Sequence, residues 1–371
     1  MTRIIVDENV PGADALFGPL GEVRTISGRE IDRSVAAGAD VLIVRSITRI
    51  NAALLDRTPV RFVGTATIGR DHIDDAFCAA AGIATGDAAG ASTRSVAEYI
   101  IAVLCALRVK RGSSIGLVGV GSIGSDVAVL AKTLGFDVRL YDPPRAARDP
   151  EFTSITRNEL ADCNVISLSV PLIHDGPHPT THLVDRSFLA TLARDTLLIN
   201  TSRGSVVKST DLLSALESGR LRAVLDVWEG EPAVPTDLLA ACSLVTPHVA
   251  GYARDAKLRG AAQVAKALAQ FLGRPIPAQP DQTSAGTIDA GQLNEPVLGP
   301  IERAVNLRRD DTALRAAFAR PETERSATFD RLRREHRHRR EFGAWTIVGG
   351  SSEDRRTLRA LGFTIADETG E

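Results

Sequence analysis

Three groups that could act on a small organic acid each follow an apolar run of the kind that forms a β-strand. Arg203 lies in the run 200–204, Glu231 in the acid-rich run 226–232, and His248 in the run 246–252. The planar fork of arginine holds a carboxylate bidentately, and histidine is a base near neutral pH. Taken singly, each has an ordinary explanation, because an arginine at a strand end often pairs with a nearby acid and an isolated histidine is often structural.

Taken together, the three groups match the requirements of hydroxy-acid oxidation. That reaction needs a base for the hydroxyl proton, a cation for the carboxylate and an acceptor for hydride. His248 supplies the base and Arg203 the cation. Glu231 could bond the far imidazole nitrogen, which would fix the tautomer and stabilise the imidazolium as it forms.

A site for the hydride acceptor lies upstream, between residues 114 and 142. An apolar run at 115–118 leads into Gly119-Val120-Gly121-Ser122-Ile123-Gly124, an amphipathic segment continues to Leu134, and a second apolar run at 136–141 ends on Asp142. Strand, glycine turn, helix and strand, with an acid about twenty positions beyond the glycines, form the dinucleotide-binding pattern. Asp142 would accept both ribose hydroxyls and repel a 2′-phosphate, which favours NAD over NADP. A purely structural glycine turn is the alternative.

The rest of the chain alternates apolar runs with helical periodicity, as parallel α/β sheets do. Strands are expected at 3–7, 41–44, 60–64, 165–170, 196–200, 223–226 and 244–246, and helices at 95–109, 185–192, 209–217 and 254–272. Ligands bind such sheets at the carboxyl edge, where the strands end. The polar residues just after each run are therefore the ones expected to form a site.

The C-terminal part has a different pattern. Residues 273–296 are rich in Pro, Gly, Ser, Thr and Gln, which predicts a linker. Beyond it, helices near 297–307 and 327–341 and a strand at 345–348 predict a smaller α/β segment. Earlier in the chain, Pro143-Pro144-Arg145 predicts a turn.

Composition is that of an ordinary globular protein. The chain has 371 residues, 44% hydrophobic, 24% charged and 4% aromatic, with a formal net charge of −2. The length suggests two or three domains, and the charge balance argues against a general nucleic-acid or membrane role. The start reads directly into a strand without the features of a signal peptide, and no run could span a bilayer. Cys78, Cys105, Cys163 and Cys242 lack metal or disulfide spacing, which indicates buried thiols in a cytoplasmic protein.

The sequence also resembles the D-isomer-specific 2-hydroxyacid dehydrogenases over nearly its whole length. The glycine motif and the set Arg203, Glu231 and His248 are shared with the family at large. Within it, the chain is similar to a branch that oxidises a phosphorylated hydroxy acid. The overall match is marked by Val6-Asp7-Glu8-Asn9, Val44-Arg45-Ser46, Gly64-Thr65-Ala66-Thr67, Asp71-His72-Ile73-Asp74 and Tyr141-Asp142-Pro143-Pro144-Arg145. The features that resemble this branch in particular are the run 226–232 with Trp228, His248 to Tyr252, and Arg308-Arg309-Asp310-Asp311.

The resemblance implies a role for each matched position. Arg203, Glu231 and His248 would be catalytic, with His248 as the proton acceptor. The residues expected to bind NAD are Gly119, Gly121, Ser122, Ile123 and Gly124 of the motif, with Asp142, Thr201, Ser202, Arg203, Asp226 and Gly251. Ser46, Thr67 and Tyr252 match substrate-contacting positions. Arg45, an arginine at a strand end, is either a further candidate for the substrate phosphate or a structural residue.

The implied fold is α/β, with two flavodoxin-like or Rossmann-like lobes of parallel sheet, a cleft that closes over both ligands, and a small C-terminal α/β dimerisation domain. Residues 1–92 and 250–280 would form the substrate-binding domain, 93–249 the NAD-binding Rossmann domain, and 286–371 the C-terminal domain. The expected partners are a small phosphorylated hydroxy acid and a second copy of the chain, with no nucleic acid, membrane or metal.

Two runs depart from the branch pattern. Ala89-Gly90-Ala91-Ser92-Thr93 replaces the usual Pro-Gly-Cys-Asn-Ala loop beside the substrate, so the substrate preference is open. Ser169-Val170-Pro171-Leu172 replaces His-Thr-Pro-Leu, and Val170 cannot donate the hydroxyl hydrogen bond that threonine would give the cofactor. We expect somewhat weaker NAD binding from this change.

Two other patterns are given structural interpretations. His174, His178 and His182 recur every four residues, but Gly176, Pro177 and Pro179 interrupt any helix, so a loop near the cofactor is favoured over a metal site. The arginine-rich run 331–340 resembles a nucleic-acid patch without aromatic residues for base stacking. A solvated or subunit-contacting face is expected there, and one of its arginines could reach a neighbouring subunit's phosphate site.

Two rival functions stay open on the sequence alone. The same machinery could oxidise another D-2-hydroxy acid, such as 3-phosphoglycerate. Alternatively, a dehydrogenase fold could serve as a non-catalytic NAD-sensing protein. The intact set of Arg203, Glu231 and His248 favours an enzyme.

Overall fold

The computed structural model describes residues 1–279, 283–336 and 339–366. The chain forms two compact units: Met1–Ser92 with Tyr252–Thr283, and Thr93–Gly251 with Ser284–Glu371. Each unit contains a parallel sheet flanked by helices, and the second also carries a small C-terminal sheet. The expected α/β class, with Rossmann-like parallel sheets and an added C-terminal α/β part, is confirmed.

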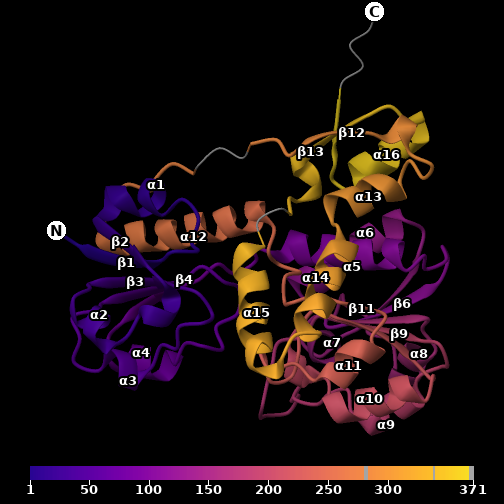
Figure 1. Cartoon of the computed structure of the whole chain (residues 1–371), viewed down its shortest axis with the longest axis horizontal. Helices are drawn as coiled ribbons and strands as arrows, with labels where there is room; N and C mark the ends of the chain where they lie inside the picture. The colour runs from indigo at the N-terminus through magenta and orange to yellow at the C-terminus, as the bar shows by residue number, and fades with distance from the viewer. Residues whose placement is uncertain (280–282, 337–338, 367–371) are drawn as a thin grey trace, which may run out of the picture. The chain divides into compact units, whose positions relative to one another are not determined.

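The first unit is organised around a five-stranded parallel sheet in the order β2-β1-β3-β4-β5. Its strands are β1 (Arg3–Asp7), β2 (Glu22–Ile26), β3 (Val41–Val44), β4 (Phe62–Thr65) and β5 (Ala84–Gly86). Its helices are α1 (Ala13–Phe17), α2 (Arg33–Ala37), α3 (Ala52–Leu55), α4 (Asp75–Ala80) and the long α12 (Arg254–Leu272). Figure 1 shows α12 lying along the sheet on the same side as α1.

Alternation along the strands gives this sheet two cores. Ile4 and Val6 of β1 face α1 and α12, whereas Ile5, between them in sequence, faces the core on the other side of the sheet. Side chains of a strand point alternately to its two faces. A parallel sheet covered on both faces therefore needs the nearly continuous apolar runs that the sequence carries.

The second unit holds a six-stranded parallel sheet in the order β11-β10-β9-β8-β6-β7. The strands are β6 (Ser114–Val118), β7 (Asp137–Tyr141), β8 (Val165–Leu168), β9 (Leu197–Asn200), β10 (Arg222–Leu225) and β11 (Leu244–Val245). The helices are α5 (Thr93–Ala106), α6 (Ser122–Thr133), α7 (Pro143–Ala146), α8 (Arg157–Ala161), α9 (Arg186–Thr191), α10 (Ser209–Glu217) and α11 (Thr236–Ala241). Residues 95–106 of α5 are all buried, as expected of a central helix.

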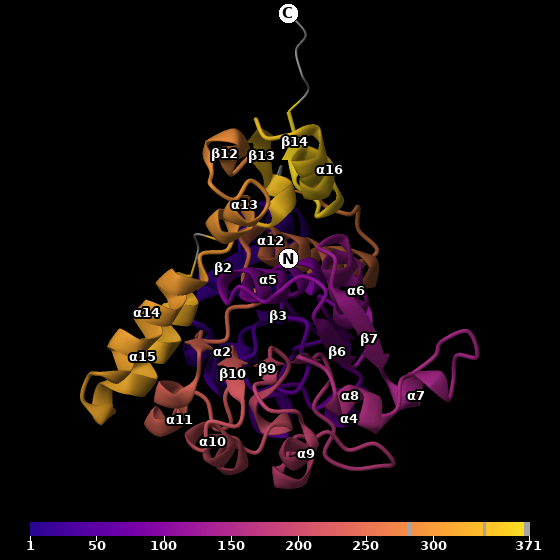
Figure 2. The same cartoon turned by 90° about the vertical axis from the view of Figure 1, so that its right-hand side faces the viewer.

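The C-terminal part adds a three-stranded parallel sheet to this unit, in the order β12-β13-β14. It comprises β12 (Gly286–Asp289), β13 (Trp345–Val348) and β14 (Thr364–Ile365), with helices α13 (Leu298–Ala304), α14 (Leu307–Phe318), α15 (Glu322–Glu335) and α16 (Ser352–Ala360). Figure 2 shows α13 and α16 over α5 and α6, with α14 and α15 descending beside α11. Ile301 and Leu358 share one apolar core with α5 and α6, so the C-terminal part packs directly on the large sheet's helices.

Three expected features differ in the structure. The predicted linker 273–296 contains β12, which the sequence conceals because Ile288 is its one buried residue. Pro143 starts the short helix α7 and does not form a simple turn, because Asp142 caps the helix and proline suits the first helical position. The predicted helix at 297–307 is two helices, α13 and the beginning of the strongly polar α14, and the one predicted at 327–341 runs from Glu322 to Glu335.

Candidate active site

The glycine turn between β6 and α6 has the backbone conformation that the motif predicts. Gly119 has a φ of +86°, which L side chains rarely adopt. A Cβ on Gly124 would collide with the carbonyl oxygen of Gly119, so the close approach of helix and turn requires glycine there. Gly121 is the N-cap of α6 and makes no side-chain cap, and Ser122 and Ile123 form the first turn.

The space around this turn fits a dinucleotide. A Cβ placed on Gly121 would meet no atom within 4 Å, so the helix N-terminus opens onto free space. Exposed N–H groups and the helix dipole at such a terminus suit a pyrophosphate. Within the described residues, the buried hydroxyls of Thr201 and Ser169 have no hydrogen-bond partner. Ser169 lies at the turn, since its carbonyl oxygen is 2.6 Å from a Cβ built on Gly119.

Asp142 is held at the glycine turn after β7. Its Oδ2 accepts a hydrogen bond from the backbone N–H of Val120 at 2.8 Å, and its Oδ1 accepts one from the backbone N–H of Arg145 at 3.0 Å. These two contacts orient the carboxylate at the end of β7, where a ribose would lie in a Rossmann fold. The residues present at this turn therefore fit NAD, and their individual contacts with it stay predictions.

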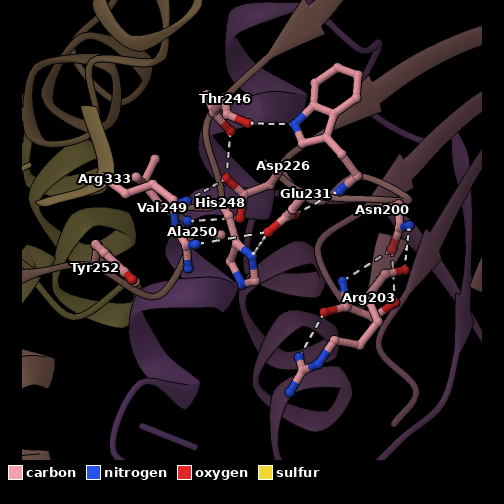
Figure 3. Close-up of polar contacts among 12 residues, drawn as sticks. Asn200, Arg203, Asp226, Glu231, Thr246, His248, Val249, Ala250, Tyr252 and Arg333 are labelled. Carbon is pink, nitrogen blue, oxygen red and sulfur yellow. Dashed lines mark hydrogen bonds and ion pairs between the residues drawn. The ribbon is translucent and has the colours of Figure 1, made fainter. Parts of the chain in front are cut away.

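Arg203, Glu231 and His248 follow three neighbouring strands. They come after β9, β10 and β11 respectively, and these strands pair side by side in parallel register. The carboxyl ends of parallel strands meet at one edge of a sheet, so the three loops lie at the same edge. Figure 3 shows Glu231 and His248 in direct contact, while Arg203 extends from the adjoining loop and donates from Nη1 to the carbonyl of Ser202 at 2.8 Å.

The closest contact within this set joins Glu231 and His248. Glu231 Oε2 lies 2.8 Å from His248 Nδ1, and Oε1 accepts the backbone N–H of Trp228 at 2.8 Å. Burial raises the pKa of Glu231, but the charge and hydrogen bond of His248 and the charge of Arg333 outweigh it, so its pKa lies below the ordinary value. An ionised carboxylate only accepts hydrogen bonds, so the proton of a neutral His248 is assigned to Nδ1 and Nε2 carries the lone pair.

Asp226 fixes the backbone of the loop that carries His248. Its buried carboxylate accepts hydrogen bonds from the hydroxyl of Thr246 at 2.6 Å and from the backbone N–H groups of Val249 and Ala250 at 2.7 and 3.0 Å. Burial raises its pKa above the ordinary value, although the charge of His248 and these hydrogen bonds act in the opposite direction. These contacts of Asp226 are all with the loop, and its predicted role at the cofactor stays a prediction.

The other residues predicted to bind the cofactor lie nearby in sequence and topology. Thr201 and Ser202 follow β9, and the Ser202 hydroxyl donates to the side chain of Asn200 at 2.8 Å. Gly251 follows the loop that Asp226 braces and is the last residue before the first unit resumes. Their contacts with NAD stay predictions.

The residues predicted to bind substrate occupy the first unit. Arg45 and Ser46 follow β3, and Thr67 follows β4, which pairs with β3. Arg45 is largely buried; its Nη2 donates to the hydroxyl of Tyr252 at 3.1 Å, and its Nη1 lies 3.9 Å from Asp7. The Thr67 hydroxyl is 2.8 Å from that of Thr65, and Ser46 is exposed. The structure thus brings Arg45 and Tyr252 together, although they are far apart in sequence.

The loop that departs from the branch pattern is anchored to α12. The carbonyl of Ala91 accepts two hydrogen bonds from the guanidinium of Arg259, at 2.9 Å from Nε and 2.7 Å from Nη2. Ala91 itself is buried. This part of the loop therefore has a defined backbone position despite its altered sequence.

The histidine-rich and arginine-rich runs have structural contacts. His182 pairs with Glu229 at 2.6 Å, and among the described residues no group of three or more potential ligands could hold a metal ion. The expectation of a solvated face at 331–340 is wrong in part. Arg331 and Arg334 are exposed, but His336, Arg339 and Arg340 are buried.

Comparison with known proteins shows which family this chain belongs to. A family model described as "D-isomer specific 2-hydroxyacid dehydrogenase, NAD binding domain" matches residues 104–250. Erythronate-4-phosphate dehydrogenase of Pseudomonas aeruginosa is 43% identical over 98% of this chain and 100% of its own length. The chain belongs to the D-isomer specific 2-hydroxyacid dehydrogenases. It is accordingly an NAD-dependent dehydrogenase that acts on a CH–OH group.

Further relatives and solved structures are also similar to this chain. The erythronate-4-phosphate dehydrogenases of Edwardsiella ictaluri and Marinobacter nauticus are 41% and 38% identical, over 97% and 98% of this chain and 98% and 99% of theirs. The TT0316 protein of Thermus thermophilus has a similar structure, with a TM-score of 0.64 and 28% identity over 74% of this chain and 99% of that one. A D-lactate dehydrogenase from Aquifex aeolicus, solved with NAD and lactic acid, shares the fold at a TM-score of 0.61 and 22% identity, over 73% of this chain and 96% of its own.

The C-terminal part of this dehydrogenase matches a family model of its own. That model, a domain of unknown function, covers residues 286–362. The most direct contribution of this part to the site is the contact of Arg333 with Glu231, which is not among the sequence-based predictions. A signal was nevertheless present, because Arg333 lies four residues after the apolar Phe329 and so shares its helix face. No helix of the described residues is long and apolar enough to cross a membrane.

Proposed function

We propose that this dehydrogenase oxidises 4-phospho-D-erythronate to (R)-3-hydroxy-2-oxo-4-phosphooxybutanoate, a step of pyridoxal 5′-phosphate (vitamin B6) biosynthesis. The observation that carries the chemistry is the Glu231–His248 pair at the sheet edge that also carries the glycine turn. The substrate is supported by full-length similarity, at 38–43% identity, to proteins named for erythronate 4-phosphate.

The proposed catalytic residues divide the reaction between them. Nε2 of His248 takes the proton of the substrate's C2 hydroxyl, while Glu231 holds Nδ1–H and stabilises the imidazolium that forms. Arg203 binds the substrate carboxylate next to the reacting carbon. NAD, when held by the residues named next, would supply the acceptor for the C2 hydride. The residues expected to hold NAD are the turn 119–124, Asp142, the run 201–203, Asp226 and Gly251.

The substrate phosphate is assigned to the residues after β3 and β4. Arg45 is held by Tyr252 and Asp7, so its guanidinium has a fixed position, and Ser46 and Thr67 add hydroxyl donors. A cation with neighbouring hydroxyls suits a phosphate group. Tyr252, which matches a substrate-contacting position, would contact the same substrate.

A panel of substrates tests this proposal. Reduction of NAD would be followed by absorbance with 4-phospho-D-erythronate, D-erythronate, 3-phosphoglycerate and D-lactate. We expect the highest kcat/KM with 4-phospho-D-erythronate, and nearly complete loss of activity in His248→Ala. A preference for the unphosphorylated acids would contradict the phosphate assignment, a preference for 3-phosphoglycerate would favour that rival substrate, and no turnover with any acid would favour an NAD-sensing protein.

The division into a substrate-binding domain (1–92 and 250–280), an NAD-binding domain (93–249) and a dimerisation domain (286–371) is part of the proposal. So is a homodimer formed through the C-terminal part. A cytoplasmic location is proposed as well, and it agrees with four free, buried cysteines. Analytical ultracentrifugation of the full chain tests the homodimer, for which we expect twice the mass of 39.5 kDa.

A further inference from the structure

Helix α15 of the C-terminal part places a cation beside Glu231. Arg333 Nη1 lies 3.9 Å from Glu231 Oε2, the same oxygen that contacts His248 Nδ1. The side chains of Arg333 and Glu231 are 13% and 18% exposed, so water screens this charge pair only partly. Figure 3 shows Arg333 and His248 approaching Glu231 from two different elements.

The position of Arg333 follows from how α15 packs. Phe329, one turn earlier, is fully buried in the core beneath the large sheet's helices, and the Arg333 guanidinium lies 6.0 Å from its ring centroid. Residues four apart share a helix face, so burial of Phe329 turns Arg333 inward. A second arginine fixes the chain after α15, because the buried Arg339 donates to the carbonyls of Ala250, at 2.6 Å, and Ser95.

We propose that Arg333 is a positioning residue for the reaction, which keeps Glu231 ionised and directed at Nδ1 of His248. This inference rests on the catalytic roles proposed for Glu231 and His248. At 3.9 Å the guanidinium acts by charge, since the distance exceeds that of a hydrogen bond. The C-terminal part would thereby contribute to the protonation state of the catalytic pair in addition to its packing role.

The charges around the pair agree with this assignment. Glu231 is faced by His248 from the loop after β11 and by Arg333 from α15, and both charges lower its pKa against the effect of burial. Asp226, at the end of β10, also interacts electrostatically with His248. Without Arg333 the pair of Glu231 and His248 would lose a nearby positive charge, and the pair would then bind a proton more tightly. The enzyme would then need a higher pH to free Nε2.

The pH dependence of kcat/KM for oxidation tests the proposal. In Arg333→Met we expect the acid limb to move to higher pH by roughly one unit. Arg333→Lys keeps the charge, and its acid limb should stay close to that of the wild type. Arg334→Met is the matched control, because it removes an equal charge from the adjacent, exposed position of α15 and should leave the limb unchanged. The position of a limb does not depend on how much of the protein folds.

Two outcomes would overturn the inference. The first is an acid limb in Arg333→Met at the wild-type pH, and the second is an equal shift in Arg334→Met, which would reveal a general charge effect. Either result leaves the proposed function intact, provided that the wild type oxidises 4-phospho-D-erythronate and His248→Ala does not. Failure of those two reference measurements would instead count against the proposed function itself.

Discussion

Glu231 accepts from the backbone N–H of Trp228 with one oxygen and contacts His248 with the other. This arrangement leaves the carboxylate little freedom to rotate, so the imidazole is held in one orientation. The lowered pKa of Glu231 keeps its carboxylate ionised, and so a hydrogen-bond acceptor, at neutral pH. A protonated Glu231 could instead donate to Nδ1, which would allow the other tautomer of His248. The tautomer of His248, the proposed catalytic base, therefore depends on its neighbour Glu231.

A single methyl group at residue 170 is expected to affect NAD affinity. Val170 packs against the glycine turn, because its Cγ1 lies 2.8 Å from a Cβ built on Gly119. In Val170→Thr a hydroxyl replaces one methyl and can donate to the cofactor, and a hydrogen bond of about 0.5–1.5 kcal/mol predicts tighter NAD binding by roughly 2- to 10-fold. Isothermal titration with NAD measures the dissociation constant. Unchanged affinity in Val170→Thr, or equal tightening in Val170→Ala, would contradict this explanation.

At the residue scale, the sequence predicts candidate site residues in the loops that follow apolar strands. Arg203, Glu231 and His248 could be found in this way, since β9, β10 and β11 are clear apolar runs. The spacing of four residues from Phe329 is the one sequence signal for Arg333, but an arginine-rich run is usually solvated, so the sequence alone does not assign Arg333 to the site. The contact of Arg45 with Tyr252 joins residues 207 positions apart and is likewise not visible in local patterns.

At the scale of elements, the turn from β6 to α6 contains two glycines that are needed for different reasons. Gly121→Ala places a methyl in open space, so we expect the free energy of unfolding to change little while NAD binding weakens at least tenfold. Gly124→Ala drives a methyl into the backbone of Gly119, and we expect destabilisation of about 1–3 kcal/mol. Urea unfolding and NAD titration of both variants measure the two effects. Wild-type NAD affinity in Gly121→Ala would show that the cofactor lies elsewhere.

The elements that the sequence conceals are short or polar. β2 has no fully buried residue and lies at a sheet edge, and β5 spans three residues. Helix α14 begins Leu-Arg-Arg-Asp-Asp, which resembles a surface loop although Leu314 and Phe318 are buried. A helix or strand can be recognised from sequence only where one of its faces is buried, because burial makes its apolar residues recur at a regular spacing. Edge strands and polar surface helices bury too few residues to show that spacing.

At the scale of the whole molecule, a buried carboxyl couples stability to pH. Glu98 lies on α5, where it accepts hydrogen bonds from Arg94 Nε at 2.9 Å and from the backbone N–H of Phe342 at 3.0 Å. Burial is the main cause that raises its pKa to about 8, with Glu341 adding to the effect and Arg94 and Arg339 opposing it. The joint between α5 and the C-terminal part therefore contains an acid that holds its proton at neutral pH.

The direction of this pKa shift determines how the free energy of unfolding changes with pH. The unfolded carboxyl has a pKa near 4.5 and the folded one a pKa of about 8, so between these values the folded state binds more protons and stability falls as pH rises. The wild type should lose up to about 1.4 kcal/mol per pH unit relative to Glu98→Gln. Urea unfolding at pH 5, 6, 7 and 8 measures the difference, with the exposed Glu335→Gln as the control. A difference that is constant or grows in favour of the wild type would contradict the assignment.

The hydrogen bonds from Arg339 to the carbonyls of Ser95 and Ala250 also predict the effect of truncating this enzyme. A truncated chain ending before Ser284 would retain the glycine turn and all three proposed catalytic side chains. It would nonetheless lose the hydrogen-bond donors to two buried carbonyls and expose the apolar surface of α5 to water. It would also lose Arg333, the positive charge beside Glu231. The C-terminal part therefore cannot be removed without affecting the rest of its unit. A chimaera that carried the nucleotide-binding residues without it would lack the charge beside the proposed acid–base pair.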